Sequence, residues 1–470
     1  MLLSGARPSR RAVHVLVTLV LAVLLGLLAP TPALAAGSGV GSGTGSGSHR
    51  GTAHRAEAAP SLTISAPIGW PDREVPVRVV LSDGGQPVPG AAIVLERRTP
   101  EGWRQVAEGV TDAEGAVVAP VLLDRTPFYD DVRATAAAAG ERPAVTATAR
   151  LRFRPRTPRV LLQAPRSVVD ERTVRLVGTW TAGGDPVDGS MRVEQRRAGE
   201  GWRPAGWIRT GADGVGSLTL RPRVDTRYRL RTAARGSWLL AGRSAERLVD
   251  NRPPFAPVVP PAGAPRPTVS VPVQPRADRP GAHPVITSIP DAVWRDMVGR
   301  SWHRGCPVGR SGLRLLRINY VGFDGYRHRG ELVAATGAIR RMAAALADMH
   351  DRGLPLRSLY RVDRFGWSAS LRGANDHRSM AADNTSAFNC RGVVGNPGVR
   401  SPHSSGRALD VNPWENPYRS RRGVVPNTWW LARSDARYAW RSRSHVVVRI
   451  MAAHGLRWTY GNGDTQHFDV

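Results

Sequence analysis

Apolar and polar residues alternate along much of the region between residues 61 and 250. The clearest alternating runs are residues 75–81, 94–97, 191–195 and 217–220. Successive side chains of a strand point to opposite faces, so this period indicates strands with one buried face. Glycine and aspartate turns separate the runs at intervals of about 8–12 residues, which is typical of an antiparallel β-sandwich.

The alternating region consists of two related segments. Glu-Gly-Trp at 101–103 recurs 99 residues later at 200–202, and other matched motifs recur at offsets of 98 to 100 residues. We therefore predict a tandem repeat of one all-β domain, at residues 61–155 and 157–250. Neither segment contains histidine or cysteine, so we expect a role in spacing or adhesion rather than catalysis. Both segments resemble the Ig-like modules of bacterial surface proteins.

The pattern changes after residue 286, where helical and strand periods are mixed. Ile339, Met342, Leu346 and Met349 recur at the spacing of one helical face, and Gly353 is a typical helix end. We therefore predict an α+β domain over residues 286–470. Its other expected elements are strands at 330–335, 356–367 and 456–460, and a helix capped by Ser444 that ends at Gly455.

The segments outside these three domains have the composition of a signal and of linkers. Residues 1–36 combine an arginine-rich start, an apolar run of about 16 residues and the cleavage-type sequence Ala-Leu-Ala. The run is shorter than the ~20 residues of a membrane-spanning helix, so we expect a cleaved signal peptide and no stable membrane span. Residues 37–60 read as a Gly/Ser linker, and residues 251–285 as a proline-rich linker.

The charge and the cysteines narrow the choice of partners and compartment. The formal net charge is +28, and all 66 basic residues are arginine. Such a chain could bind nucleic acid or anionic cell-wall polymers, but no nucleic-acid-binding motif is present, so we expect no nucleic-acid partner. Cys306 and Cys390 would most simply form a disulfide in an exported monomer, contributing about 4 kcal/mol. We therefore expect a secreted or wall-associated protein.

Two short clusters near residue 470 carry the candidate chemistry. The first contains His403 and Asp410, seven residues apart across Gly406, and the second contains Asp464 and His467. Two imidazoles and one carboxylate make a catalytic Zn²⁺ site with an open position for water. The remaining carboxylate could then act as a general base. The spacing across a glycine favours a strand, a turn and a returning strand at 408–411.

The pattern Ser-x-His-x-x-Gly-x-Ala-x-Asp followed by Asp-x-x-His resembles the D-alanyl-D-alanine carboxypeptidase family of zinc peptidases. The resemblance covers about residues 290–470 and implies the fold that this family shares with the hedgehog signalling domain. It implies that His403, Asp410 and His467 bind zinc and that Asp464 is the general base. Ser401 would bind substrate or support the site. Arg391, in the segment Asn-Cys-Arg, would hold the oxyanion or the substrate carboxylate.

Several alternatives stay open at this point. Asp469 shares a strand face with His467 and could replace Asp410 as a ligand. His328 and His377 could line the cleft, and the tryptophan pair at 429–430 could frame a groove, although structural roles fit these residues better.

The resemblance predicts a D,D-carboxypeptidase that removes the terminal D-Ala of peptidoglycan stem peptides. The alternatives are an endopeptidase of the same fold, cutting an L-Ala-D-Glu bond or a crosslink, and a non-catalytic wall-binding protein. Carboxypeptidases of the family more often have Glu where this chain has Asp464. Residue 464 therefore leaves the choice between exopeptidase and endopeptidase open.

Overall fold

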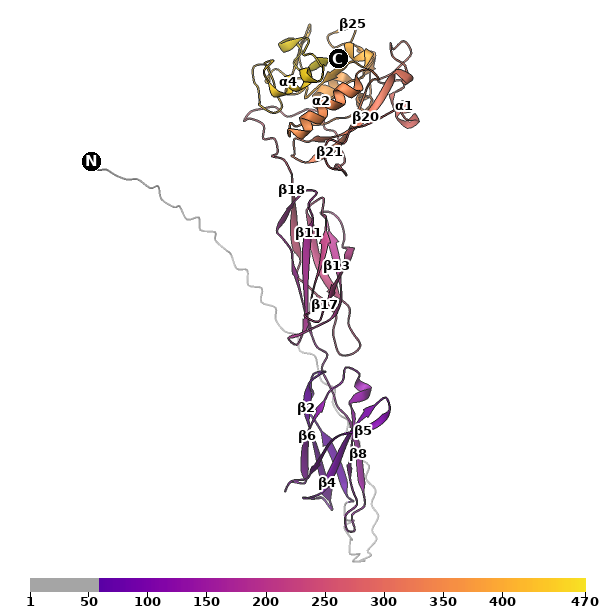
Figure 1. Ribbon diagram of the computed structural model, residues 1–470, viewed down its shortest axis with the longest axis vertical. Helices are drawn as coiled ribbons and strands as arrows, with labels where there is room; N and C mark the ends of the chain where they lie inside the picture. Colours follow the sequence, from indigo (N-terminus) through magenta and orange to yellow (C-terminus); the bar gives the residue numbers. More distant parts are fainter. Residues whose placement is uncertain (1–58) are drawn as a thin grey trace, which may run out of the picture. The chain divides into compact units, whose positions relative to one another are not determined.

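The computed structural model describes residues 59–470 (Figure 1). The expected signal peptide at 1–36 and nearly all of the Gly/Ser linker at 37–60 lie outside the described residues. The described chain is mostly β-sheet with few helices and contains several hydrophobic cores. In this part of the chain no helix is long and apolar enough to cross a membrane.

The first repeat consists of two antiparallel four-stranded sheets. One sheet comprises β1 (Ser61–Ser65), β2 (Glu74–Asp83), β3 (Gln86–Pro87) and β6 (Ala116–Leu122), and the other β4 (Ala92–Thr99), β5 (Gly102–Val110), β7 (Asp131–Ala136) and β8 (Val145–Arg150). Alternate residues of each sheet, such as Val77, Val79, Ile93 and Leu95, are buried in one common core. The alternation of the sequence therefore does correspond to strands with one apolar face.

The second repeat has the same two-sheet arrangement. One sheet comprises β9 (Pro158–Gln163), β11 (Val174–Ala182), β12 (Asp185–Pro186) and β15 (Val215–Leu220), and the other β10 (Ser167–Val169), β13 (Gly189–Arg196), β14 (Arg203–Thr210), β16 (Thr226–Thr232), β17 (Gly242–Arg243) and β18 (Arg247–Arg252). A backbone irregularity interrupts β4 between Leu95 and Glu96 and β13 between Val193 and Glu194. The internal repeat thus extends to a β-bulge at matching positions.

The C-terminal region is built on a three-stranded sheet of β19 (Val285–Thr287), β20 (Leu313–Val321) and β21 (Arg327–Ala335). Helices α2 (Ile339–Asp351) and α4 (Val446–Ala453) share a core with this sheet (Figure 1). The face predicted for α2 is buried, and Gly353 follows the helix with φ +66°. The remaining α-helices and strands are α1 (Asp291–Met297), α3 (Asp376–Ala381), β22 (Trp367–Ser368), β23 (Gly373–Ala374), β24 (Gly392–Val393), β25 (Asn396–Arg400), β26 (Ala408–Asp410), β27 (Tyr418–Ser420), β28 (Gly423–Val425) and β29 (His467–Asp469).

The proline-rich segment 253–282 is hydrogen-bonded to the C-terminal domain. Trp414 donates its indole N–H to the Pro265 carbonyl at 2.8 Å, and the Val269 N–H donates to Ala381 at 3.1 Å. The side chain of Gln274 is buried and makes hydrogen bonds with Leu359 and Tyr320. This segment therefore contributes to the folded domain that carries the candidate site.

Three local predictions in this domain were wrong. Residues 356–366 form no strand, because the backbone N–H groups of Leu359 and Tyr360 bond side-chain oxygens instead of a neighbouring strand. Residues 456–460 pair with β29 only through a bridge at Arg457, because β29 is three residues long. Helix α4 is capped by the imidazole of His445 rather than by Ser444. Hydrophobic period alone does not identify the partners of the backbone.

Candidate metal centre and active site

The short antiparallel pair β26–β29 brings two predicted ligands together. Its register places Asp410 directly opposite His467. The Asp410 Oδ1 atom lies 3.0 Å from His467 Nδ1, and both side chains are buried. The returning strand predicted after Gly406 is present as β26, although it ends at Asp410.

His403 reaches the same point from a 3-10 turn, Pro402–Ser405, and not from the predicted strand. Pro402 begins the turn, and Gly406 ends it in the left-handed conformation with φ +68°. A Cβ atom on Gly406 would lie 2.7 Å from the backbone nitrogen of Ala335, so only glycine fits there without displacing β21. The turn places His403 Nε2 3.1 Å from Asp410 Oδ2 and 3.1 Å from His467 Nδ1.

Each imidazole is held from its far side by an oxygen atom. His403 Nδ1 lies 2.6 Å from the Ala387 carbonyl, and His467 Nε2 lies 3.0 Å from Asp469 Oδ1. Both outer nitrogens therefore carry the proton, which leaves both inner nitrogens to bind either a metal ion or a second proton beside Asp410. Ligand atoms that bind one zinc ion tetrahedrally lie roughly 3.4 Å apart, given bonds of about 2.0–2.2 Å. The three residues thus fit a divalent cation in both spacing and donor type.

The charges of these groups depend strongly on one another. Burial alone would raise the pKa of Asp410, but the charges and hydrogen bonds of His403 and His467 lower it. Burial alone would lower the pKa of His467, but hydrogen bonds with Asp410 and Asp469 raise it to about 10. The site therefore favours a positive charge between the Asp410 carboxylate and the two rings, which a proton or a metal ion can supply.

The cluster lies in a cavity of about 380 Å³. Asp464 lines this cavity, and burial together with the negative charge of Asp410 raises the pKa of Asp464 to about 8. Its Oδ1 atom has no hydrogen-bond partner among the described residues. Asp464 therefore has a carboxyl oxygen free for proton exchange beside the three grouped side chains.

The comparisons with known proteins bear on this part of the chain. Residues 394–470 match the family model described as D-alanyl-D-alanine carboxypeptidase. The matched segment contains His403, Asp410, Asp464 and His467, and it supports a peptidase. Among curated proteins, no sequence matches the chain.

Solved structures similar to the chain include part of a large adhesion protein and invasin. One is a tetra-tandem repeat from the extending region of a large adhesion protein, at 15% identity and a TM-score of 0.27, covering 59% of this chain and 64% of that one. The other is invasin, a bacterial integrin-binding protein, at 15% identity and a TM-score of 0.29, covering 57% of this chain and 48% of that one. The chain thus spans less than two thirds of either protein.

Arg391 and Ser401 both line the cavity, as the resemblance implied for substrate contacts. The Arg391 guanidinium is buried and paired with Asp376, with Nη2 2.7 Å from Oδ2, while Nε has no hydrogen-bond partner in the described structure. The Ser401 hydroxyl accepts the N–H of His403 at 3.3 Å. Ser401 therefore supports the turn that carries His403.

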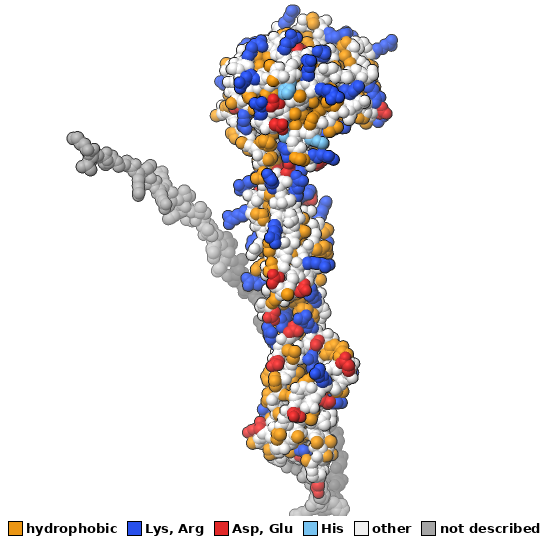
Figure 2. Space-filling model, in the orientation of Figure 1, with side chains coloured by type: hydrophobic (Ala, Val, Ile, Leu, Met, Phe, Trp, Pro, Cys, Tyr) orange, Lys and Arg blue, Asp and Glu red, His pale blue; other side chains and the backbone are white. Residues whose placement is uncertain are grey.

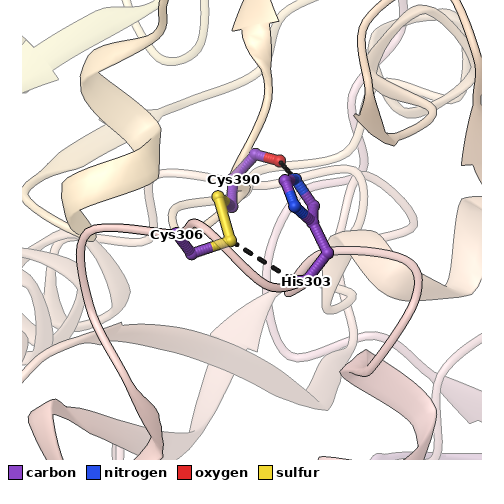
Figure 3. Close-up of side chains that lie close together, drawn as sticks. All are labelled: His303, Cys306 and Cys390. Atoms are coloured by element: carbon purple, nitrogen blue, oxygen red, sulfur yellow. Dashed lines mark hydrogen bonds between the residues drawn. A yellow bond between two sulfur atoms is a disulfide. The ribbon is translucent and has the colours of Figure 1, made fainter.

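Cys390, which directly precedes Arg391, forms a disulfide with Cys306 (Figure 3). His303 Nε2 lies 3.1 Å from the Cys390 carbonyl, and the Cys390 N–H donates to Ser301 at 2.9 Å. The loop that contains Cys306 thus fixes the backbone immediately before Arg391. Since both sulfur atoms are bonded to each other, His303, Cys306 and Cys390 do not form a thiolate metal site.

The alternative site residues are placed elsewhere. Asp469 bonds the outer nitrogen of His467 and is not part of the three-residue cluster. His328 is buried between Gln274 and Asp324, away from the cavity, and His377 is exposed on α3. Trp429 and Trp430 pack in a separate apolar cluster, as expected for structural residues.

Sequence reasoning missed several polar residues at the cavity, among them Asp376, Tyr418 and Gln466. Asp376 lies 15 residues before its partner Arg391 and belongs to no motif, so only the fold reveals the pair. Tyr418 lines the cavity, and its backbone forms a bridge with Asp464. Gln466 directly precedes His467 and has a buried Oε1 atom without a partner among the described residues. The position of Gln466 between Asp464 and His467 was the sequence feature that could have identified it.

Proposed function

We propose that the C-terminal domain is a zinc-dependent D,D-carboxypeptidase that removes the terminal D-Ala from peptidoglycan stem peptides. One observation carries the proposal: the inner atoms of His403, Asp410 and His467 lie 3.0–3.1 Å apart, beside the unpartnered carboxylate oxygen of Asp464. Two neutral imidazoles and a carboxylate are a typical donor set for catalytic zinc.

The three grouped residues would hold the ion, and zinc bound there supplies a Lewis acid that acidifies water and polarises a peptide carbonyl. The protein contributes the orientation of its own groups. The Ala387 carbonyl and Asp469 fix the two rings so that Nε2 of His403 and Nδ1 of His467 face inward. Such outer partners determine which nitrogen remains free to bind.

Asp464 would move the proton during hydrolysis. Its Oδ1 atom is buried and unpartnered among the described residues, so it can accept a proton from water and pass it to the leaving amine. The raised pKa of Asp464 means that this carboxyl holds a proton more readily than an exposed aspartate does. A cation in the site would partly offset the effect of Asp410 on this pKa.

Arg391 would orient the substrate. Asp376 fixes the guanidinium at the cavity wall through Nη2, which leaves Nε to donate to a substrate oxygen. A terminal carboxylate or the oxygen that becomes negative in the transition state would each fit such a donor. The cavity volume of about 380 Å³ suits one small terminal residue and its neighbour.

We further propose that the protein is exported and acts as a monomer at the cell wall. The signal-like residues 1–36 and the disulfide support an oxidising compartment outside the cytosol. The two β-rich repeats would serve as Ig-like modules that hold the catalytic domain near peptidoglycan.

The direct test is digestion of purified muropeptides by the zinc-loaded full chain, followed by mass spectrometry. Release of a single D-Ala from pentapeptide stems is the expected result, and Asp464→Ala should abolish it. Cleavage inside the stem or at a crosslink would instead establish the endopeptidase, the alternative that the aspartate at 464 leaves open. If no bond is cut although zinc binds, the domain is not a peptidoglycan peptidase.

A further inference from the structure

One row of side chains crosses four adjacent strands of the second repeat. In the register of β14, β13, β16 and β17, Trp207 lies opposite Arg192, Arg192 opposite Arg231, and Arg231 opposite Arg243. Directly opposite residues of antiparallel strands point to the same face and stand about 4.5–5.5 Å apart at Cβ. Three guanidinium groups and one indole therefore form a continuous line across the sheet, which we call the arginine row.

The arginine row is on the outer face of its sheet. The intervening residues Met191, Val193 and Leu230 point into the core and are fully buried. All four members of the row are exposed, Trp207 with 60% of its surface. Figure 2 shows basic side chains spread along the visible surface of this repeat.

Few carboxylates neutralise this face. Glu194 pairs with Arg229 at 2.7 Å and reaches Arg231 only at 3.8 Å. Within residues 59–470, no carboxylate lies within 4.0 Å of the side-chain nitrogens of Arg192 or Arg243. Exposed Arg209 and Arg227 point from the same face and extend the positive charge along β14 and β16. The face thus carries a strong excess of positive charge.

The first repeat provides an internal comparison. The β-bulge of the first repeat aligns Glu96 with Glu194. The row of the first repeat that corresponds to the arginine row therefore runs through Glu108, Val94, Thr135 and Thr146. No arginine stands in this row. The arginines nearby are paired, Arg133 with Glu96 and Arg150 with Asp131. The fold of the repeat therefore does not require an arginine row.

We propose that the arginine row of the second repeat is a docking surface for a linear polymer of phosphodiester-linked polyol units, as found in cell walls. Like charges placed directly opposite each other destabilise a sheet, and bound phosphates would remove that repulsion. The planar arginine fork matches phosphate oxygens. Trp207, at the end of the row, offers an apolar ring to the polyol between phosphates.

A wall polymer fits better than nucleic acid for two reasons. The disulfide and the signal-like start of the chain support a protein outside the cytosol, where wall polymers are the abundant polyanions. The row also holds a single exposed aromatic ring, whereas single-stranded nucleic acid is usually bound by several rings that stack successive bases. This inference does not depend on the peptidase activity.

The test compares two double variants of the full chain that lose equal charge. Arg192→Val with Arg231→Thr installs the residues that stand at the matching positions of the first repeat, in a sheet of the same arrangement. Arg159→Val with Arg175→Thr changes two exposed arginines on the opposite sheet of the same repeat. Binding of a purified poly(glycerol phosphate) of defined length is measured by calorimetry over a range of salt concentrations.

We expect the row variant to bind at least about tenfold more weakly, with a salt dependence reduced by about two charges. The matched variant should change much less. Without polymer, the row variant should melt at a higher temperature than the parent, because the opposed charges are gone. The reciprocal change, Val94→Arg with Thr135→Arg in the first repeat, should strengthen binding.

Equal losses in both double variants would overturn the proposal, since binding would then follow total charge only. A single-stranded DNA with the same number of phosphates is the second probe. If it binds more tightly than the polymer and through the same two arginines, the row is a nucleic-acid surface and the proposal fails.

Discussion

Asp410 and His467 face each other across a pair of three-residue strands, with Oδ1 of one 3.0 Å from Nδ1 of the other. They are 57 residues apart in sequence. A shift of one residue in this pairing would turn one of the two side chains to the opposite face of the strands. The candidate metal centre therefore depends on strand register as much as on the identity of its ligands.

The contact between Asp469 and His467 predicts a graded effect on metal binding. Asp469→Ala removes the acceptor that orients the ring, so zinc affinity should fall by about 10–100-fold. Asp469→Asn keeps an acceptor but loses the charge, and its affinity should be intermediate. Competition with a chromophoric chelator measures both.

Asp278→Asn, an exposed change in the proline-rich segment, is the control for these two variants and should bind zinc as the parent does. If Asp469→Ala binds zinc equally well, the contact has no orienting role.

Asp464 should matter for turnover and little for metal binding. Asp464→Asn keeps the size of the side chain but cannot accept the proton, so kcat should fall by about 10²–10⁴-fold. Zinc affinity should stay within about threefold of the parent. Asp464→Glu, which restores a carboxylate, should recover part of the rate. A variant that loses zinc and rate together would assign Asp464 to the ligand set instead.

The sequence predicted the elements of this protein that depend on local patterns. The alternating runs became strands, and the four apolar positions of α2 became its buried face. The two motif clusters contained the residues that the fold groups together. Long-range partners were beyond reach: nothing near Asp376 indicates Arg391, and nothing near Ala387 indicates His403. These contacts exist only after distant segments meet, so periodicity and spacing carry no information about them.

The proline-rich segment gives a prediction about stability. Gln274 accepts from Tyr320 O–H at 2.7 Å and Leu359 N–H at 2.9 Å, and it donates to the Leu359 carbonyl at 2.9 Å. Gln274→Ala would leave these buried groups without partners, which should destabilise the domain by about 3 kcal/mol or more. Thermal unfolding of the full chain measures this.

Gln163→Ala removes an exposed amide from β9 and is the matched control, which should change stability by less than about 0.5 kcal/mol. Equal effects of the two substitutions would mean that the segment is dispensable. A fragment prepared for metal analysis should accordingly begin near residue 253 rather than at 286.

Asp130 predicts an unusual pH dependence in the first repeat. The residue is 1% exposed, and burial raises its pKa to about 6 despite a hydrogen bond from the Asp124 N–H. In the unfolded chain the pKa is about 3.9. Between these values the folded state holds more protons, so this group's contribution lowers stability as the pH rises from about 4 to 6.

At pH 7 the raised pKa of Asp130 should lower the free energy of unfolding by up to about 3 kcal/mol. Asp130→Asn should remove this pH-dependent contribution to stability. Calorimetry between pH 4 and pH 7 should therefore show that the difference in unfolding free energy between parent and variant grows with pH. A constant difference across this range would contradict the raised pKa.

Gly406 carries no functional group, yet the turn that presents His403 depends on it. Any side chain there would adopt an unfavourable backbone conformation and press on β21 at the same time. In a mutational scan read out by activity, Gly406 should therefore score as severely as the three grouped side chains. Intolerance to substitution therefore does not distinguish residues that bind the metal from residues that only shape the backbone around it. A measurement of metal content at each sensitive position would separate the two groups.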